Sequence, residues 1–146
     1  MTVGTGWLIL NVGGGATELK IRCETWEYDD DDKGAKIIKY PPRGRYGYTL
    51  NKHERIFKFK NIFVVTYADW NNLKQTLKTL EDTGTVINMA IQIDIAGNYE
   101  KPDGTNDKIP VIIKSRKGHT KKYQGEAQVY VLKMLVVEQA GALSAI

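Results

Sequence analysis

The most conspicuous candidate for chemistry is a run of four aspartates, Asp29 to Asp32, followed by Lys33 and Gly34. Clustered carboxylates can hold a cation, and a calcium loop beginning at Asp29 would place Gly34 at its required sixth position. Lys33 then occupies the fifth position and Tyr40 the twelfth, where a glutamate is needed. Because aspartate and glycine favour turns, we interpret residues 29–34 as a solvated or interface loop of a hairpin. A metal loop and an engineered DDDDK cleavage site, which no tag flanks, are the alternatives.

The side chains that could act in catalysis match no known catalytic arrangement. His53 and His119 both lie among lysines and arginines, which disfavour a protonated imidazole. Neither Ser115 nor Ser144 stands in the context of a nucleophile elbow. Cys23 belongs to an alternating segment, which predicts a buried strand position. The sequence therefore predicts a protein that is not an enzyme, with no catalytic residue, no metal, no cofactor and no small-molecule substrate.

Length and composition are those of one folded domain. The chain has 146 residues, of which 42% are hydrophobic and 26% charged, with a net charge of +4. Its single cysteine excludes an internal disulfide. No apolar run approaches the roughly 20 residues that span a membrane, and the N-terminal segment does not resemble a signal peptide. We expect a single β-rich domain over residues 1–138, a flexible C-terminal arm over 139–146, no membrane contact and a cytoplasmic origin.

Periodicity predicts mostly strands. Alternating or short apolar runs indicate strands over residues 8–12, 17–28, 36–40, 55–66, 86–95, 109–117, 121–123 and 126–138. Residues 40–55 read as a long loop, and Gly118-His119 reads as a turn. Strands on both sides of one helix predict an α+β, mostly β fold. We expect an antiparallel β-sandwich or split barrel with one flanking helix.

The one predicted helix covers about residues 67–82. Thr66 and Asp69 have the spacing of an N-terminal capping box, and Gly84 suits the C-terminal cap. Its apolar stripe consists of Trp70, Leu73, Leu77 and Leu80. Because the stripe is narrow and the other face is polar, the helix should lie on a sheet or against a neighbour.

The charges are unevenly distributed along the chain. Acidic residues dominate from Glu18 to Asp32, and basic residues dominate from Lys33 to Lys60 and again from Lys108 to Lys122. Ordinary solvated strands and loops would explain this pattern, but so would head-to-tail assembly between an acidic and a basic patch. The candidate assembly residues are Asp29, Asp30, Asp31, Asp32, Arg43, Arg45, Tyr46, Tyr48 and Lys52.

Two other kinds of binding remain open. Cations interleaved with tyrosines in residues 40–55 are typical of single-strand nucleic-acid binders. The candidate nucleic-acid contacts are Arg43, Arg45, Lys117, Lys121 and Lys122. A β-domain that binds a small ligand or carbohydrate could instead use Trp26, Tyr46, Tyr48 and Tyr123 as platforms.

Residues 56–138 resemble the small structural proteins of tailed-virus tails. The segment FKFKNIFVVTYADWNNLKQTLKTLEDTGTVINMAIQI has the order strand, capped helix, glycine and strand, and VIIKSRKGHTKKYQGEAQVYVLKMLVVEQAG ends in a long alternating strand. Tail-tube and distal-tail (baseplate hub) proteins share this layout of a β-sandwich or split barrel with one helix. The resemblance implies a virion protein, assembled in the host cytoplasm, that forms rings, commonly hexameric, around a DNA channel. Its partners would be copies of itself and neighbouring tail proteins, and the resemblance brings no catalytic residue.

Overall fold

The computed structural model describes residues 2–29, 35–40, 44–49, 55–124 and 127–146. These residues form eight strands, one short 3-10 helix and one α-helix. The elements are β1 (Thr2–Leu10), η1 (Gly15–Thr17), β2 (Leu19–Tyr28), β3 (Ala35–Tyr40), β4 (Gly44–Thr49), β5 (Ile56–Val64), α1 (Tyr67–Thr83), β6 (Ile87–Gln92), β7 (Ile109–Gln124) and β8 (Ala127–Gln139).

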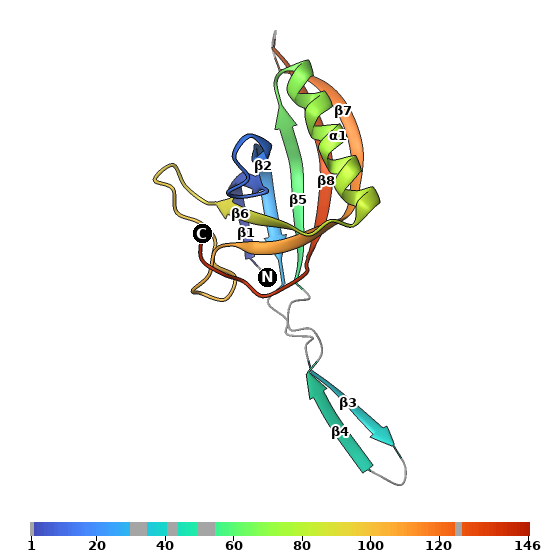
Figure 1. The fold of residues 1–146 in the computed structure, drawn as a ribbon. Coiled ribbons are helices and arrows are strands. Elements are labelled where there is room, and N and C mark those ends of the chain that lie inside the picture. Colours follow the sequence, from blue (N-terminus) through green and yellow to red (C-terminus); the bar gives the residue numbers. More distant parts are fainter. Residues whose placement is uncertain (1, 30–34, 41–43, 50–54, 125–126) are drawn as a thin grey trace.

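Six strands close an antiparallel barrel in the order β1-β2-β5-β8-β7-β6 (Figure 1). The strand β1 completes the ring, because Leu8 lies opposite Ile21 of β2 and also opposite Ile91 of β6. The prediction of a mostly β fold with one helix is confirmed. The barrel is closed, however, where a sandwich or split barrel was expected, because β1 pairs with a strand far away in the sequence and no local pattern reveals that pairing.

Apolar side chains that alternate with polar ones along each strand fill the barrel interior. In β2, Ile21 and Cys23 are buried while Arg22 and Glu24 are exposed, as the period-two pattern predicted. Phe57 of β5 is fully buried and lies in one core cluster with residues from every barrel strand. This single core makes the barrel and α1 one packed unit.

The helix α1 forms where its capping residues predicted. The Thr66 hydroxyl accepts a hydrogen bond from the Asp69 backbone N–H at 3.2 Å, and Gly84 ends the helix with a left-handed φ of 64°. The apolar stripe faces the barrel, with Trp70, Leu73 and Leu77 buried.

The strand β7 is longer than predicted, and the turn expected at Gly118-His119 is wrong. Gly118 has a positive φ of 78°, yet β8 pairs with the residues on both sides of it, so the strand continues. A register shift between Ile113 and Ser115 marks a bulge. We call Ile109–Ile113 the closed half of β7 and Ser115–Gln124 its extended half.

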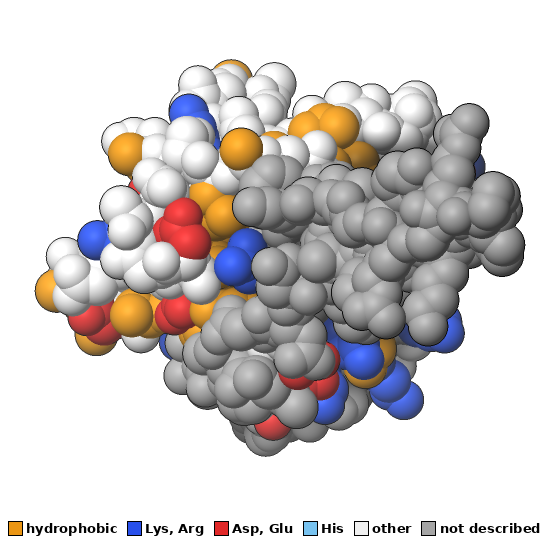
Figure 2. All heavy atoms as spheres, turned by 90° about the horizontal axis from the view of Figure 1, so that it is seen from below, with side chains coloured by type: hydrophobic (Ala, Val, Ile, Leu, Met, Phe, Trp, Pro, Cys, Tyr) orange, Lys and Arg blue, Asp and Glu red, His pale blue; other side chains and the backbone are white. Residues whose placement is uncertain are grey.

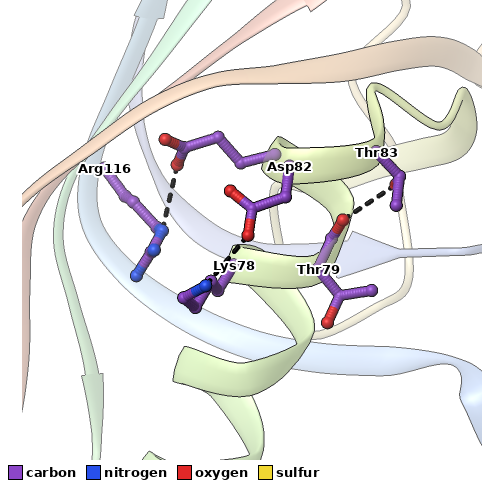
Figure 3. Close-up of polar contacts among 6 residues, drawn as sticks. Lys78, Thr79, Asp82, Thr83 and Arg116 are labelled. Atoms are coloured by element: carbon purple, nitrogen blue, oxygen red, sulfur yellow. Dashed lines mark hydrogen bonds and ion pairs between the residues drawn. The ribbon is translucent and has the colours of Figure 1, made fainter.

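The helix α1 packs against the extended half of β7 (Figure 1). At its C-terminal end, the Arg116 Nε donates a hydrogen bond to Glu81 Oε2 at 3.0 Å (Figure 3). The same figure shows Lys78 paired with Asp82 one turn along the helix, at 2.9 Å. The Arg116–Glu81 pair joins β7 to α1, whereas the Lys78–Asp82 pair lies within the helix.

The strands β3 and β4 form a separate two-stranded sheet, with Ile38 opposite Tyr46. Two predictions are wrong here. Residues 29–34 do not join a hairpin of β2 and β3, because β3 pairs with β4 while β2 pairs with β1 and β5. The predicted long loop 40–55 contains β4, whose short Gly- and Tyr-rich sequence has no clear alternation.

The C-terminal residues lie along the start of β7. Gln139, predicted as the first residue of a flexible arm, ends β8, and Ser144 exchanges two backbone hydrogen bonds with Lys108. The Ile146 backbone N–H donates to Asp107 Oδ1 at 3.0 Å, and Leu143 packs against the core. The segment 140–146 is thus attached to the barrel by its backbone hydrogen bonds and by the Leu143 side chain.

Candidate assembly surface

Three glutamates of the acidic stretch make contacts within the same subunit. Glu18 accepts a hydrogen bond from the Gly13 backbone, Glu24 from Asn61, and Glu27 lies 3.9 Å from Lys60. These glutamates are therefore engaged within the subunit. Of the four aspartates, Asp29 is exposed directly after β2, and Asp30, Asp31 and Asp32 lie outside the described residues.

The basic assembly candidates fall on and around the β3–β4 hairpin. Arg45, Tyr46 and Tyr48 lie on β4, opposite Lys39, Ile38 and Lys36 of β3. The side chains of these strands are not described, and Arg43 and Lys52 lie outside the described residues. Three of the five assembly candidates from residues 40–55 thus lie on one strand, β4. Figure 2 shows acidic and basic side chains side by side on the described part of the end of the molecule seen from below.

The hairpin itself is an unusual element. Both outer edges of the β3–β4 pair lack a neighbouring strand among the described residues. A two-stranded hairpin is at best marginally stable in water, because it buries little apolar surface. An element of this kind is expected to gain order from a partner.

A second open edge belongs to β7. The strand β6 pairs only with Ile109, Pro110 and Val111, and no other described strand continues that edge of β7. The nucleic-acid candidates Lys117 and Lys121 are exposed on the extended half, whereas Lys122 pairs with Val129 and its side chain is not described. Basic residues along an open edge oppose pairing with an identical edge.

The connection between β6 and β7 presents an apolar side chain. Asp94 accepts hydrogen bonds from the backbone and side chain of Asn98, and these bonds lower the pKa of its carboxyl group. Asp103 accepts backbone hydrogen bonds from Asn106 and Thr105, and its pKa is lowered for the same reason. Between them, Ile95 is 98% exposed. A side chain of this kind on a hydrogen-bonded loop suits a contact with another chain.

Sequence reasoning missed an aromatic cluster between α1 and β7–β8. Trp70 stacks on Tyr130 with ring centroids 5.6 Å apart and meets the edge of His119 at 5.7 Å. Tyr67 lies 6.2 Å from Tyr130. Tyr67 and Trp70 are three residues apart, and this spacing indicates that they share one side of the helix. The contact with His119 was missed because a turn was expected at residue 118.

His119 is on strand β7 and not in the predicted turn. Its pKa is lowered, first by partial burial and then by the charges of Arg116 and Lys74. The imidazole is therefore neutral near pH 7. Ser115 is likewise on β7, opposite Val136, and Cys23 is 3% exposed. Among the described residues, no three His, Cys, Asp or Glu side chains are grouped so that they could hold a metal ion.

Trp26, a candidate platform for a small ligand, is buried. It is 3% exposed and stacks with Tyr28 at 6.0 Å inside the core. Its indole N–H has no hydrogen-bond partner in the described part of the chain. The ligand-platform interpretation is therefore wrong for this residue.

Comparisons with protein-family models, with curated proteins and with solved structures gave no match to this chain. None of the described helices is both long enough and apolar enough to cross a membrane.

Proposed function

We propose that this protein is a structural subunit of a viral tail, of the tube or distal-tail type, which assembles with copies of itself into rings around a DNA channel. The resemblance of residues 56–138 to tail proteins supports this proposal, and it implies a hexameric ring in a virion. The observation that carries the assembly part is the β3–β4 hairpin, whose strands pair only with each other in the described chain.

The hairpin favours assembly for a physical reason. Its two open edges leave backbone N–H and C=O groups available for a further strand, and such groups are well satisfied by pairing with a neighbouring chain. The open edge of β7 beyond Val111 provides a second surface of the same kind. A contact between two different surfaces is heterologous, and repeating it generates a ring or a filament.

Ile95 offers an apolar contribution to such a contact. Burying a side chain of this size contributes about 1.5–3 kcal/mol. The internal hydrogen bonds of Asp94 hold its loop in place before any contact forms. A preordered loop loses less conformational freedom on association than a disordered one.

The first experiment is to measure the mass of the full chain in solution by light scattering, with negative-stain images of the same sample. Rings or tubes are the expected result. A monomer at all accessible concentrations, with no particles in the images, would contradict self-assembly of the isolated protein.

A variant set then tests which surfaces assemble. Replacing Asp29, Asp30, Asp31 and Asp32 by serine should weaken assembly, more strongly at low salt, where charge contacts are least screened. A matched control removes four acidic charges elsewhere, with Glu24→Gln, Asp69→Asn, Asp82→Asn and Asp107→Asn. Equal assembly of the serine variant and the wild type at every salt concentration would remove the aspartates from the contact.

A further inference from the structure

The aromatic cluster beside α1 has an exposed part that the assembly proposal does not use. Trp70 and Tyr130 form its floor and are only 6% and 7% exposed. Tyr67 is 64% exposed and touches this floor through Tyr130. The ring of Tyr67 is therefore supported from below by packed aromatic rings and open to a ligand on its outer side.

Two lysines border these rings. The Lys74 Nζ lies 5.4 Å from the centroid of Trp70, and the Lys121 Nζ lies 5.9 Å from the centroid of Tyr130. Contacts of this kind attract an ammonium group to a ring face. They hold the two positive charges beside the aromatic floor, and His119 completes the border on β7.

The described carboxylates nearest to Lys74 are engaged with other groups. Glu81 is engaged with Arg116, and Asp82 with Lys78. Asp69 lies two residues after Tyr67, which places it about 200° around the helix, on the opposite flank. Lys74 makes no ion pair with a carboxylate in the described part of the structure.

We infer that the surface formed by Tyr67, Lys74, His119 and Lys121, here named the Tyr67 surface, binds single-stranded nucleic acid. An unpaired base has an open π-face that can stack on Tyr67, and the adjacent phosphates can reach the two ammonium groups. A duplex hides its base faces within its own stack, so it can use only the charges. Of the nucleic-acid contacts predicted from the sequence, this surface contains Lys121 but neither Arg43 nor Arg45 of residues 40–55.

The test measures the binding of a fluorescein-labelled short oligothymidylate to the full-length protein by fluorescence anisotropy over a series of salt concentrations. Wild-type protein should bind saturably at low salt and more weakly as salt rises. Tyr67→Ala should weaken binding about tenfold, whereas Tyr67→Phe should stay within about twofold, because it keeps the stacking ring.

The lysines are tested through the salt dependence. Lys74→Gln and Lys121→Gln should each lower the slope of log K against log salt by about 0.7, the value for one phosphate contact on a single strand. The matched controls are Lys78→Gln and Lys114→Gln, whose wild-type lysines are paired with Asp82 and Glu138. Both controls should bind like the wild type.

Three results would each overturn the inference. They are no saturable binding by the wild type at low salt, equally tight binding of a duplex of the same length, and an equal loss of affinity in Lys78→Gln and Lys74→Gln. Because Tyr67 is exposed, its variants should melt like the wild type in circular dichroism, and this keeps the binding result interpretable. The outcome is independent of ring assembly, which light scattering reports separately.

Discussion

The two halves of β7 belong to the same strand but are stabilised in different ways. The closed half, Ile109–Ile113, pairs with β6 at its first three residues and with β8 further along, and Ile109, Val111 and Ile113 are buried in the barrel. The extended half, Ser115–Gln124, pairs with β8 alone among the described strands, and α1 packs against it. In this half α1 contacts side chains of the strand, while the edge beyond Val111 has no neighbouring strand among the described residues.

The difference is visible in the side chains that share the inner face. Residues directly opposite each other in an antiparallel pair point to the same side. Arg116 lies opposite Leu135, and His119 lies opposite Leu132. Both polar side chains contact α1, because Arg116 donates to Glu81 and the His119 ring lies against Trp70. A strand can thus extend beyond a barrel if an amphipathic helix covers the adjoining core with its apolar side chains and also contacts the polar side chains of the strand.

The largest expected effect comes from removing the helix contact. Leu77→Ala should lower the free energy of unfolding by about 2–5 kcal/mol, because Leu77 is 1% exposed and leaves a cavity. Hydrogen exchange should show a greater loss of protection in the extended half than in the closed half. Val111→Ala is the matched change in the closed half. A uniform loss of protection along β7 in both variants would mean that the two halves are one cooperative unit.

A smaller effect is expected at Gly118, in the extended half. A Cβ atom there would lie 2.7 Å from Lys133 Cβ, and the backbone has a positive φ of 78°. Gly118→Ala should therefore cost roughly 1–3 kcal/mol in urea unfolding. Gly84→Ala is the control, because Gly84 also has a positive φ but a Cβ would meet no atom within 4 Å. Equal costs for the two variants would show that Lys133 moves aside freely.

The smallest effect concerns the pH dependence of stability. His119 has a lowered pKa in the folded protein, mainly through partial burial, against an ordinary value of 6.5. Above that value the imidazole is neutral in both states, and below it the unfolded chain takes up a proton first. Stability contributed by neutral His119 is thus present above about pH 6.5 and is lost as pH falls through the folded pKa.

The variant His119→Gln tests this assignment. Its stability should decline less than that of the wild type between about pH 7 and pH 5. Thermal unfolding at matched pH values measures the difference. Parallel declines in the two proteins would assign the acid sensitivity to other groups.

Local patterns predicted α1 well and the sheet only in part. The capping residues Thr66 and Gly84 fix both helix ends because they act on neighbouring backbone groups. Local sequence patterns could not predict that β1 and β6 pair and close the barrel, since this pairing joins distant segments. Gly118 was predicted to be a turn residue because glycine is common in turns. In the structure it is a strand residue with a positive φ.

The contacts of the candidate site residues depend on the alignment of distant strands, which the sequence does not display. A contiguous acidic stretch suggested one patch, yet Glu24 and Glu27 find partners on β5. Those partners become visible only when β2 and β5 are aligned in the sheet. The Tyr67 surface likewise combines residues of α1 with residues of β7, so no single segment of the sequence contains it.

The β1–β6 pairing also has a consequence for how the chain folds. Strand β1 is synthesised before the other barrel strands, but its second neighbour, β6, follows only after β2, β3, β4, β5 and α1. Closing such a long loop is entropically costly, and folds dominated by distant contacts form slowly, on a scale of about milliseconds to seconds. Until β6 arrives, the outer edge of β1 is open to other nascent chains. The closing step should therefore set both the folding rate and the concentration at which the unfinished protein aggregates.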